Sequence, residues 1–169
     1  MINADLFYVL LGISNPTSPF KAAYNRTTPQ TIASRYLGKG YAAEFYEWGG
    51  KSQRISWFWG PGEFIIPTSP YSTVKMLDEG TCVHMTYGNM ISILKKHDDA
   101  RAQYKHFREQ HNIAIAERIK EIKTKTPLEV YVNLISKKPW VLEQVSQEDL
   151  ASYLNVDLKT LKEFSNMKA

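Results

Sequence analysis

The chain has 169 residues, of which 43% are apolar and 22% are charged. These proportions are typical of a globular protein and exclude a disordered or collagen-like chain. The net charge of +4 is mild and spread over both halves, so charge alone is weak support for a nucleic-acid partner. The single cysteine, Cys82, excludes a disulfide framework and a cysteine-rich metal site. No apolar run has the length of a membrane span and the first residues lack a signal-peptide pattern, so we expect a cytoplasmic protein with no membrane partner.

Residues 31–87 have the pattern of short β-strands, because aromatic and β-branched residues alternate with glycine-rich breaks. The segments 41–47 and 54–59 flank a glycine pair and predict a hairpin. The segments 73–77 and 81–87 predict a second hairpin. Several short strands at regular spacing favour an antiparallel sandwich or barrel.

The apolar period becomes helical after residue 88. Asn89 is a candidate cap for a short helix over 90–96, and Asp98 and Asp99 open a long helix that extends to about Lys123. An apolar stripe on so long a helix favours dimerisation, although the stripe could instead pack on the β domain. The predicted dimer interface consists of Tyr104, Phe107, His111, Ala114, Ile115, Ile119 and Ile122.

The C-terminal residues predict three more helices. One begins at Pro127 and ends before Pro139. Ser146 starts a near capping box for the next, and Asp157 can cap a last helix over 158–167. Two short helices joined by three or four residues form either a helix-turn-helix or a generic αα corner.

The order and spacing of these segments resemble the Crp/Fnr family of bacterial transcription regulators, most closely its short members without a wing. The resemblance covers roughly residues 31–165. Its last segment, Val145–Val156, is similar to the family pattern VPQxxIASYLGI. The other matching segments are Tyr36–Gly40, Gly50–Phe58, Gly60–Phe64, Ser72–Met76 and Pro127–Tyr131.

The resemblance implies an α+β protein with three parts. Residues 1–97 are expected to form an antiparallel β-roll, a jelly roll or double-stranded β-helix like that of cyclic-nucleotide-binding domains. Residues 98–125 are the expected dimerisation helix. Residues 126–169 are the expected helix-turn-helix domain. Family members are homodimers that place the second helix of this motif in the major groove of double-stranded DNA.

The ligand loop departs from the family pattern. Nucleotide-binding members hold the cyclic phosphate with backbone amides and an Arg, and the ribose with a Glu. Here Pro70 stands near the Arg position and Ile66 near the Glu position. We therefore predict no cyclic nucleotide and no cofactor, and a pocket that is empty, filled by its own side chains or adapted to an apolar ligand. An unidentified small-molecule effector remains a candidate partner. The predicted degenerate pocket consists of Phe64, Ile66, Pro70, Tyr71, Ser72 and Thr73, with core packing favoured for Trp57, Trp59 and Tyr71.

The resemblance also implies which residues contact DNA. Lys162 could reach guanine, and Glu163 could accept from cytosine or repel phosphate. Lys137, Lys138 and Lys168 could contact phosphates, or could be solvated surface charges. The predicted DNA-binding residues are Ser146, Gln147, Lys159, Thr160, Lys162 and Glu163.

The sequence thus predicts a homodimeric DNA-binding transcription regulator and not an enzyme. The alternative is a degenerate dimer that senses or scaffolds without specific DNA binding. A cupin-like enzyme would need clustered histidines, whereas His84 is the only histidine of the β region and is expected to be structural. We predict no metal site, although the four histidines leave a haem open.

Overall fold

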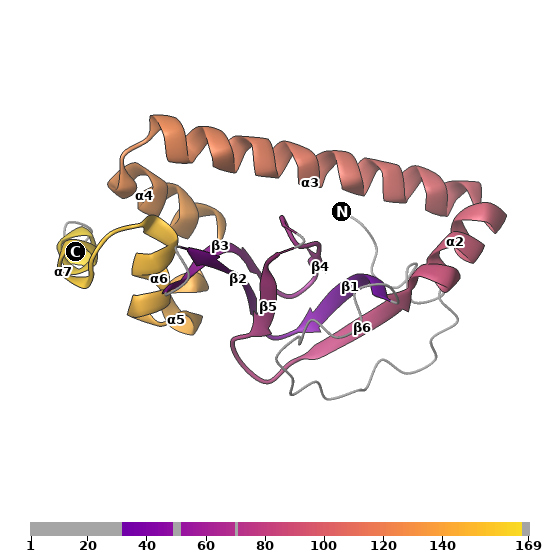
Figure 1. Ribbon diagram of the computed structural model, residues 1–169, viewed down its shortest axis with the longest axis horizontal. Helices are drawn as coiled ribbons and strands as arrows, with labels where there is room; N and C mark the ends of the chain where they lie inside the picture. The colour runs from indigo at the N-terminus through magenta and orange to yellow at the C-terminus, as the bar shows by residue number, and fades with distance from the viewer. Residues whose placement is uncertain (1–31, 49–51, 70, 167–169) are drawn as a thin grey trace.

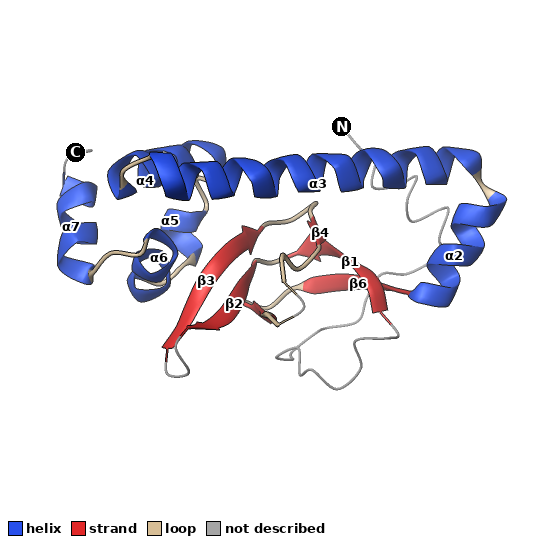
Figure 2. Cartoon of the chain, turned by 45° about the horizontal axis from the view of Figure 1, so that its top comes forward, coloured by secondary structure: helices blue, strands red, loops and turns tan. Residues whose placement is uncertain are grey.

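The computed structural model describes residues 32–48, 52–69 and 71–166. Predictions that involve residues 1–31, 49–51, 70 and 167–169, including those for Pro70 and Lys168, lie outside the described residues. One long helix, α3 (Asp98–Thr124), runs along the molecule beside the strands, and the other helices lie at its two ends (Figure 1). The cartoon in Figure 2 shows the same arrangement from a second direction.

The described strands form two antiparallel sheets. The first has the order β4-β1-β6 and the second the order β3-β2-β5. The strands are β1 (Ile32–Lys39), β2 (Ala42–Trp48), β3 (Ser52–Trp59), β4 (Phe64–Ile65), β5 (Thr73–Met76) and β6 (Thr81–Thr86). The predicted hairpin of residues 41–47 and 54–59 is confirmed, because β2 pairs with β3 over its whole length.

The second predicted hairpin is wrong. β5 pairs with β2, and β6 pairs with β1, so the two strands belong to different sheets. The turn between them is held by the Leu77 N–H, which donates to the Tyr41 carbonyl at 2.8 Å. Gly80 is required in this turn because a Cβ atom there would lie 2.3 Å from the Lys39 carbonyl oxygen. A strand pattern shows which face is apolar but does not choose the neighbouring strand, which explains the error.

Two helices, α2 (Tyr87–Lys96) and α3, follow β6, and capping residues predict the start of the second of them. α2 begins three residues before the predicted start, because Thr86 caps it by accepting from the Asn89 N–H at 3.2 Å. α3 has the predicted start at Asp98 and ends at Thr124.

The C-terminal helices include one that the sequence did not predict. α4 (Pro127–Lys137) has a full capping box between Thr126 and Glu129. The short α5 (Val141–Gln144) follows Pro139 and was not predicted. α6 (Gln147–Leu154) and α7 (Leu158–Asn166) confirm the last two predicted helices.

One apolar core joins the second sheet to the C-terminal helices. It consists of Ala43, Phe45, Ile55, Phe58, Val130, Tyr131, Leu134, Ile135, Val141, Leu150, Ala151, Leu154 and Leu161. A second core lies between the two sheets and includes Leu37, Trp59 and Cys82. Within the described residues, no helix has both the length and the apolarity needed to cross a membrane.

Candidate functional site

α6 and α7 form a tightly turned helical pair. They are joined by residues 155–157, and Asn155 adopts a left-handed conformation with φ of 57°. Ser146 caps α6 by accepting from the Asp149 N–H at 3.0 Å. Asp157 caps α7 by accepting from the Thr160 N–H at 2.7 Å, and these bonds lower the pKa of the Asp157 carboxyl. The caps therefore fix where each helix starts, and Ala151 of α6 is buried in the core.

α7 has one packed face and one exposed polar face. Leu161 is buried, and Phe164 lies 5.9 Å from the Tyr131 ring of α4. The six predicted DNA-binding residues lie on these two helices or at the α6 cap: Ser146, Gln147, Lys159, Lys162 and Glu163 are exposed, and Thr160 is half-buried.

Lys138 was considered as a contact to DNA phosphates, but its ammonium group is already bound within the chain. Its ammonium group donates to both carboxylate oxygens of Glu63, at 2.7 and 2.8 Å, and to the Phe58 carbonyl at 2.9 Å. This charge therefore ties α4 to the strand region. Lys137 is exposed and lies 3.8 Å from Glu117 of α3.

α6 is docked on β3. The Ile55 N–H donates to the Ser152 hydroxyl at 3.3 Å, and Arg54 hydrogen-bonds to the side chain of Asn155. The Tyr153 ring packs 4.9 Å from the Phe58 ring. The helical pair is thus held by a strand of the predicted sensor domain.

A buried carboxylate fills the loop that was predicted to be the degenerate ligand pocket. Glu44 of β2 is fully buried. The Thr68 N–H and hydroxyl each donate to it at 2.7 Å, the Ser56 hydroxyl donates at 2.6 Å, and the Ser69 N–H at 3.4 Å. The Ser72 hydroxyl donates as well. Hydrogen-bond donors from the chain itself therefore compensate this buried negative charge.

Sequence reasoning missed Glu44. The available signal was an acidic residue inside the strand segment Ala42-Ala43-Glu44-Phe45, whose other members are small or apolar. Such a position predicts burial, and a buried carboxylate requires partners. The partners lie more than ten residues away, so only the folded chain identifies them.

The other predicted pocket residues are dispersed. Phe64 packs on α3, 4.5 Å from the Phe107 ring. Tyr71 is 78% exposed, and Ile66 and Thr73 are half-buried. Of the three aromatic residues expected in the core, Trp59 is 1% exposed and lies between the sheets, and Trp57 is half-buried. The expectation is wrong for the exposed Tyr71.

The predicted dimer stripe of α3 has two sides. Phe107, His111 and Ala114 line a pocket against the strands, and Tyr104 and Ile115 are half-buried. Ile119 and Ile122 are 49% and 62% exposed. Burial and the nearby Arg108 lower the pKa of His111, and the centre of its ring lies 6.1 Å from that of Trp57 in a T-shaped arrangement.

The described residues offer little for metal or thiol chemistry. Burial raises the pKa of the Cys82 thiol to about 11, which keeps it protonated and unreactive at neutral pH. No group of three His, Cys, Asp or Glu side chains in this part of the chain is placed to hold a metal ion.

Comparisons with known proteins identify solved structures that have a similar fold. Neither protein-family models nor curated protein sequences match the chain. Solved structures do match: FixK2 from Bradyrhizobium japonicum has a TM-score of 0.71 at 10% identity, covering 89% of this chain and 84% of that one. The c-di-GMP responsive global regulator CLP of Xanthomonas campestris has a TM-score of 0.70 at 14% identity, covering 98% and 91%.

A third structure extends the same likeness. A cyclic nucleotide-binding domain containing protein from Listeria monocytogenes has a TM-score of 0.70 at 15% identity, and the match covers 97% of this chain and 89% of that one. These neighbours span nearly the whole chain, from the strands through α3 to the C-terminal helices. The chain therefore has the α+β fold of the Crp/Fnr regulators.

Proposed function

We propose that the chain is a DNA-binding transcription regulator in which α7 enters the major groove. The observation that carries the proposal is the α6–α7 pair, whose caps and buried face leave Lys159, Lys162 and Glu163 exposed together. Lysines on such a face can contact phosphates or guanine, and Glu163 can accept from cytosine. The fold shared with transcription regulators supports this assignment.

We propose further that the regulator is a homodimer. Ile119 and Ile122 are exposed on α3 beside the half-buried Ile115. A second α3 would cover this apolar edge, and a two-fold dimer would present two copies of α7 to a symmetric DNA site.

The proposed sensor domain has lost the means to hold a cyclic phosphate. Glu44 supports this, because the Thr68 N–H and the Ser72 hydroxyl, which could bind an anion, donate to its carboxylate. A phosphate approaching this loop would meet a buried negative charge, and like charges repel.

Fluorescence anisotropy tests the DNA-binding proposal. The probe is DNA from upstream of the gene, titrated at several salt concentrations beside scrambled DNA of equal length. We expect selective binding that weakens steeply with salt, because lysines that contact phosphates release counterions. Replacing Lys159 and Lys162 by alanine should weaken binding by about tenfold or more.

A control variant removes two lysine charges at a position far from α7. Lys95 and Lys96 are exposed at the end of α2, at the far end of the molecule from α7 (Figure 1). Their double replacement by alanine should change the affinity by about twofold or less. Equal losses in both double variants, or equal affinity for both DNAs, would contradict the proposal and favour a dimer without specific DNA binding.

A further inference from the structure

Strand β3 contains a β-bulge beside the buried carboxylate. Glu44 of β2 lies opposite Trp57, and Phe45 lies opposite Ile55. Ser56, which stands between those two residues of β3, is therefore an extra residue with no opposite residue in β2. A bulge bends its strand, interrupts the ladder of hydrogen bonds and redirects the groups beside it. Among the described strands, β3 lies at the edge of its sheet, so its outward backbone groups need partners from elsewhere in the fold.

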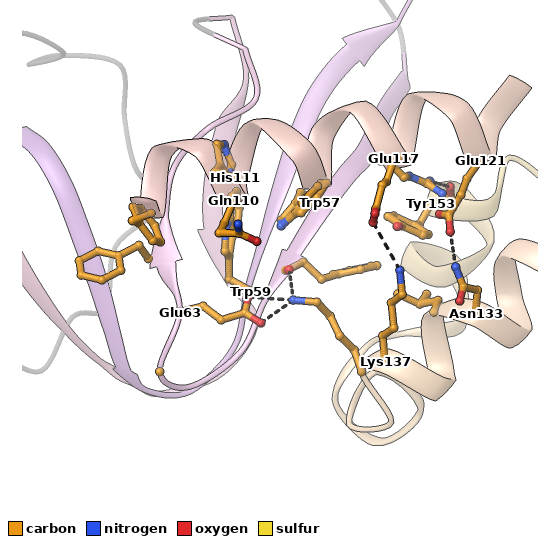
Figure 3. A pocket seen from close by; sticks show the side chains of 18 of the residues that line it. Trp57, Trp59, Glu63, Gln110, His111, Glu117, Glu121, Asn133, Lys137 and Tyr153 are labelled. Atoms are coloured by element: carbon orange, nitrogen blue, oxygen red, sulfur yellow. Dashed lines mark hydrogen bonds and ion pairs between the residues drawn. The ribbon is translucent and has the colours of Figure 1, made fainter. Parts of the chain in front are cut away.

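α6 docks on β3 at the residue next to the bulge. The Ile55 N–H donates to the Ser152 hydroxyl of α6 at 3.3 Å. The carbonyl of the following residue, Tyr153, accepts from Arg118 of α3 at 2.9 Å. Figure 3 shows Trp57 of β3 and Tyr153 of α6 beside α3, in a cavity of about 420 Å³ that both residues line. The path of β3 around its bulge therefore determines where α6 rests.

The carboxylate of Glu44 holds the bulge residue in place. The Ser56 hydroxyl donates to Glu44 Oε2 at 2.6 Å. The same carboxylate accepts from the N–H and the hydroxyl of Thr68, each at 2.7 Å, and from the Ser72 hydroxyl. Hydrogen bonds to an ionised and buried acceptor are stronger than those between neutral groups. One side chain thus joins β2, the bulge of β3 and the loop between β4 and β5.

Glu44 lies on the face of β2 opposite to the core that β2 shares with α6. Ala43 and Phe45, on either side of it, belong to that apolar core. Because successive side chains of a strand point to opposite faces, the Glu44 side chain points away from the core and toward the loop. Its influence on α6 therefore passes through Ser56 and Ile55 of the neighbouring strand.

We infer that Glu44 is a positioning residue for the DNA-binding helices. Through Ser56, its carboxylate fixes the bulge that presents the Ile55 N–H to α6. This inference rests on the proposed DNA-binding function. The anion that holds the helices in place belongs to the chain itself, so the docking of α6 requires no anion from outside. Loss of the carboxylate should release the bulge, and α6 and α7 would then sample more than one position.

NMR spectroscopy of the full chain without DNA tests the link between Glu44 and α6. The position of the Ile55 amide proton signal reports the hydrogen bond to Ser152, and the variant Ser152→Ala gives the position for the broken bond. We expect Glu44→Gln and Ser56→Ala to move the signal in the same direction as Ser152→Ala. Glu44→Gln keeps the size of the side chain but removes its charge and replaces one acceptor oxygen by a donor.

Two control variants separate this link from general effects. Glu47→Gln removes a carboxylate from an exposed position of β2 and should leave the Ile55 signal unmoved. Ile65→Ala removes a buried side chain from the core between the sheets, which lowers the stability without changing the bulge. The Ile55 signal of this second control should also stay at the wild-type position.

Chemical rescue tests whether the carboxylate itself is responsible. In Glu44→Ala, sodium formate should return the Ile55 signal toward its wild-type position, because a small carboxylate can occupy the vacated place. Sodium chloride at the same ionic strength should not.

Fluorescence anisotropy measures the consequence for DNA binding. Glu44→Gln should weaken binding to the DNA that the wild type selects by about threefold or more, whereas Glu47→Gln should change the affinity by about twofold or less. Formate should strengthen DNA binding by Glu44→Ala relative to chloride at equal ionic strength, a comparison that removes the general effect of salt.

The outcomes separate this inference from the regulator proposal. An Ile55 signal at its wild-type position in Glu44→Gln overturns the link between the carboxylate and the bulge. A moved signal with unchanged DNA affinity overturns the positioning role. Formate that acts on Glu44→Ala no differently from chloride overturns the role of the carboxylate. A wild type that selects no DNA contradicts the proposed function, whereas the NMR result on the docking of α6 is obtained without DNA.

Discussion

At the scale of single residues, the side chain of Glu44 accepts the hydrogen bonds that the predicted ligand loop can donate. A carboxylate in a fully buried position is costly unless donors surround it. Hydroxyl and amide donors of Ser56, Thr68, Ser69 and Ser72 meet that need. The loop is therefore organised around an anion that belongs to the chain.

Replacing Glu44 by alanine tests this reading. The change leaves several buried donors without an acceptor, so we expect the free energy of unfolding to fall by about 2–4 kcal/mol. Urea denaturation measures it. Glu47→Ala, at an exposed position of the same strand, should cost about 0.5 kcal/mol or less. Sodium sulfate should stabilise Glu44→Ala more than the wild type, because an external anion can take the vacated place. A loss below about 1 kcal/mol would contradict the role given to Glu44.

At the scale of elements, α3 connects the two ends of the molecule and has two apolar edges. One edge, with Phe107, His111 and Ala114, faces the strands and the cavity. The adjacent edge includes Ile119 and Ile122, which are exposed. An exposed edge on a 27-residue helix is suited to a second copy of that helix.

Placing glutamate at both Ile119 and Ile122 should split the proposed dimer. Buried charges would oppose each other across the two-fold axis, and analytical ultracentrifugation should show a monomer of half the wild-type mass. Ile113→Glu is the matched control, because Ile113 is 51% exposed and its helical position places it on the opposite side of α3. A double variant that remains dimeric would show that this edge is not the interface.

At the scale of the whole molecule, the second sheet and the C-terminal helices share one core. Ile55 and Phe58 of β3 belong to the same cluster as Leu134 of α4 and Leu150 of α6. The ion pair of Lys138 with Glu63 crosses the same boundary. The C-terminal helices and β3 are therefore in direct contact, through one shared core.

Truncating Leu134 to alanine tests that continuity. The loss of a buried side chain should cost about 2–5 kcal/mol, and hydrogen exchange should accelerate in β2 and β3 as well as in α4 and α6. Leu142→Ala, at a 50% exposed position, should leave exchange in both regions nearly unchanged. Faster exchange confined to the helices would show that the two regions unfold separately.

The sequence by itself determined the local elements, because their causes lie within a few residues. The caps Ser146 and Asp157 predicted α6 and α7, and Thr126-Pro127 predicted the start of α4. The hairpin of β2 and β3 followed from apolar segments on either side of a glycine pair. The family resemblance carried by the order and spacing of these segments anticipated the α+β fold that the solved structures share.

Tertiary structure alone decided which strands pair and which residues surround a site. The partners of Glu44 and Arg118 are up to 35 residues distant, and no local period encodes such contacts. The placement of β5 and β6 in different sheets likewise depends on which neighbours are free to pair. Burial then determines the chemistry, since the same Glu or Arg side chain that water would solvate on the surface needs a specific partner inside the fold.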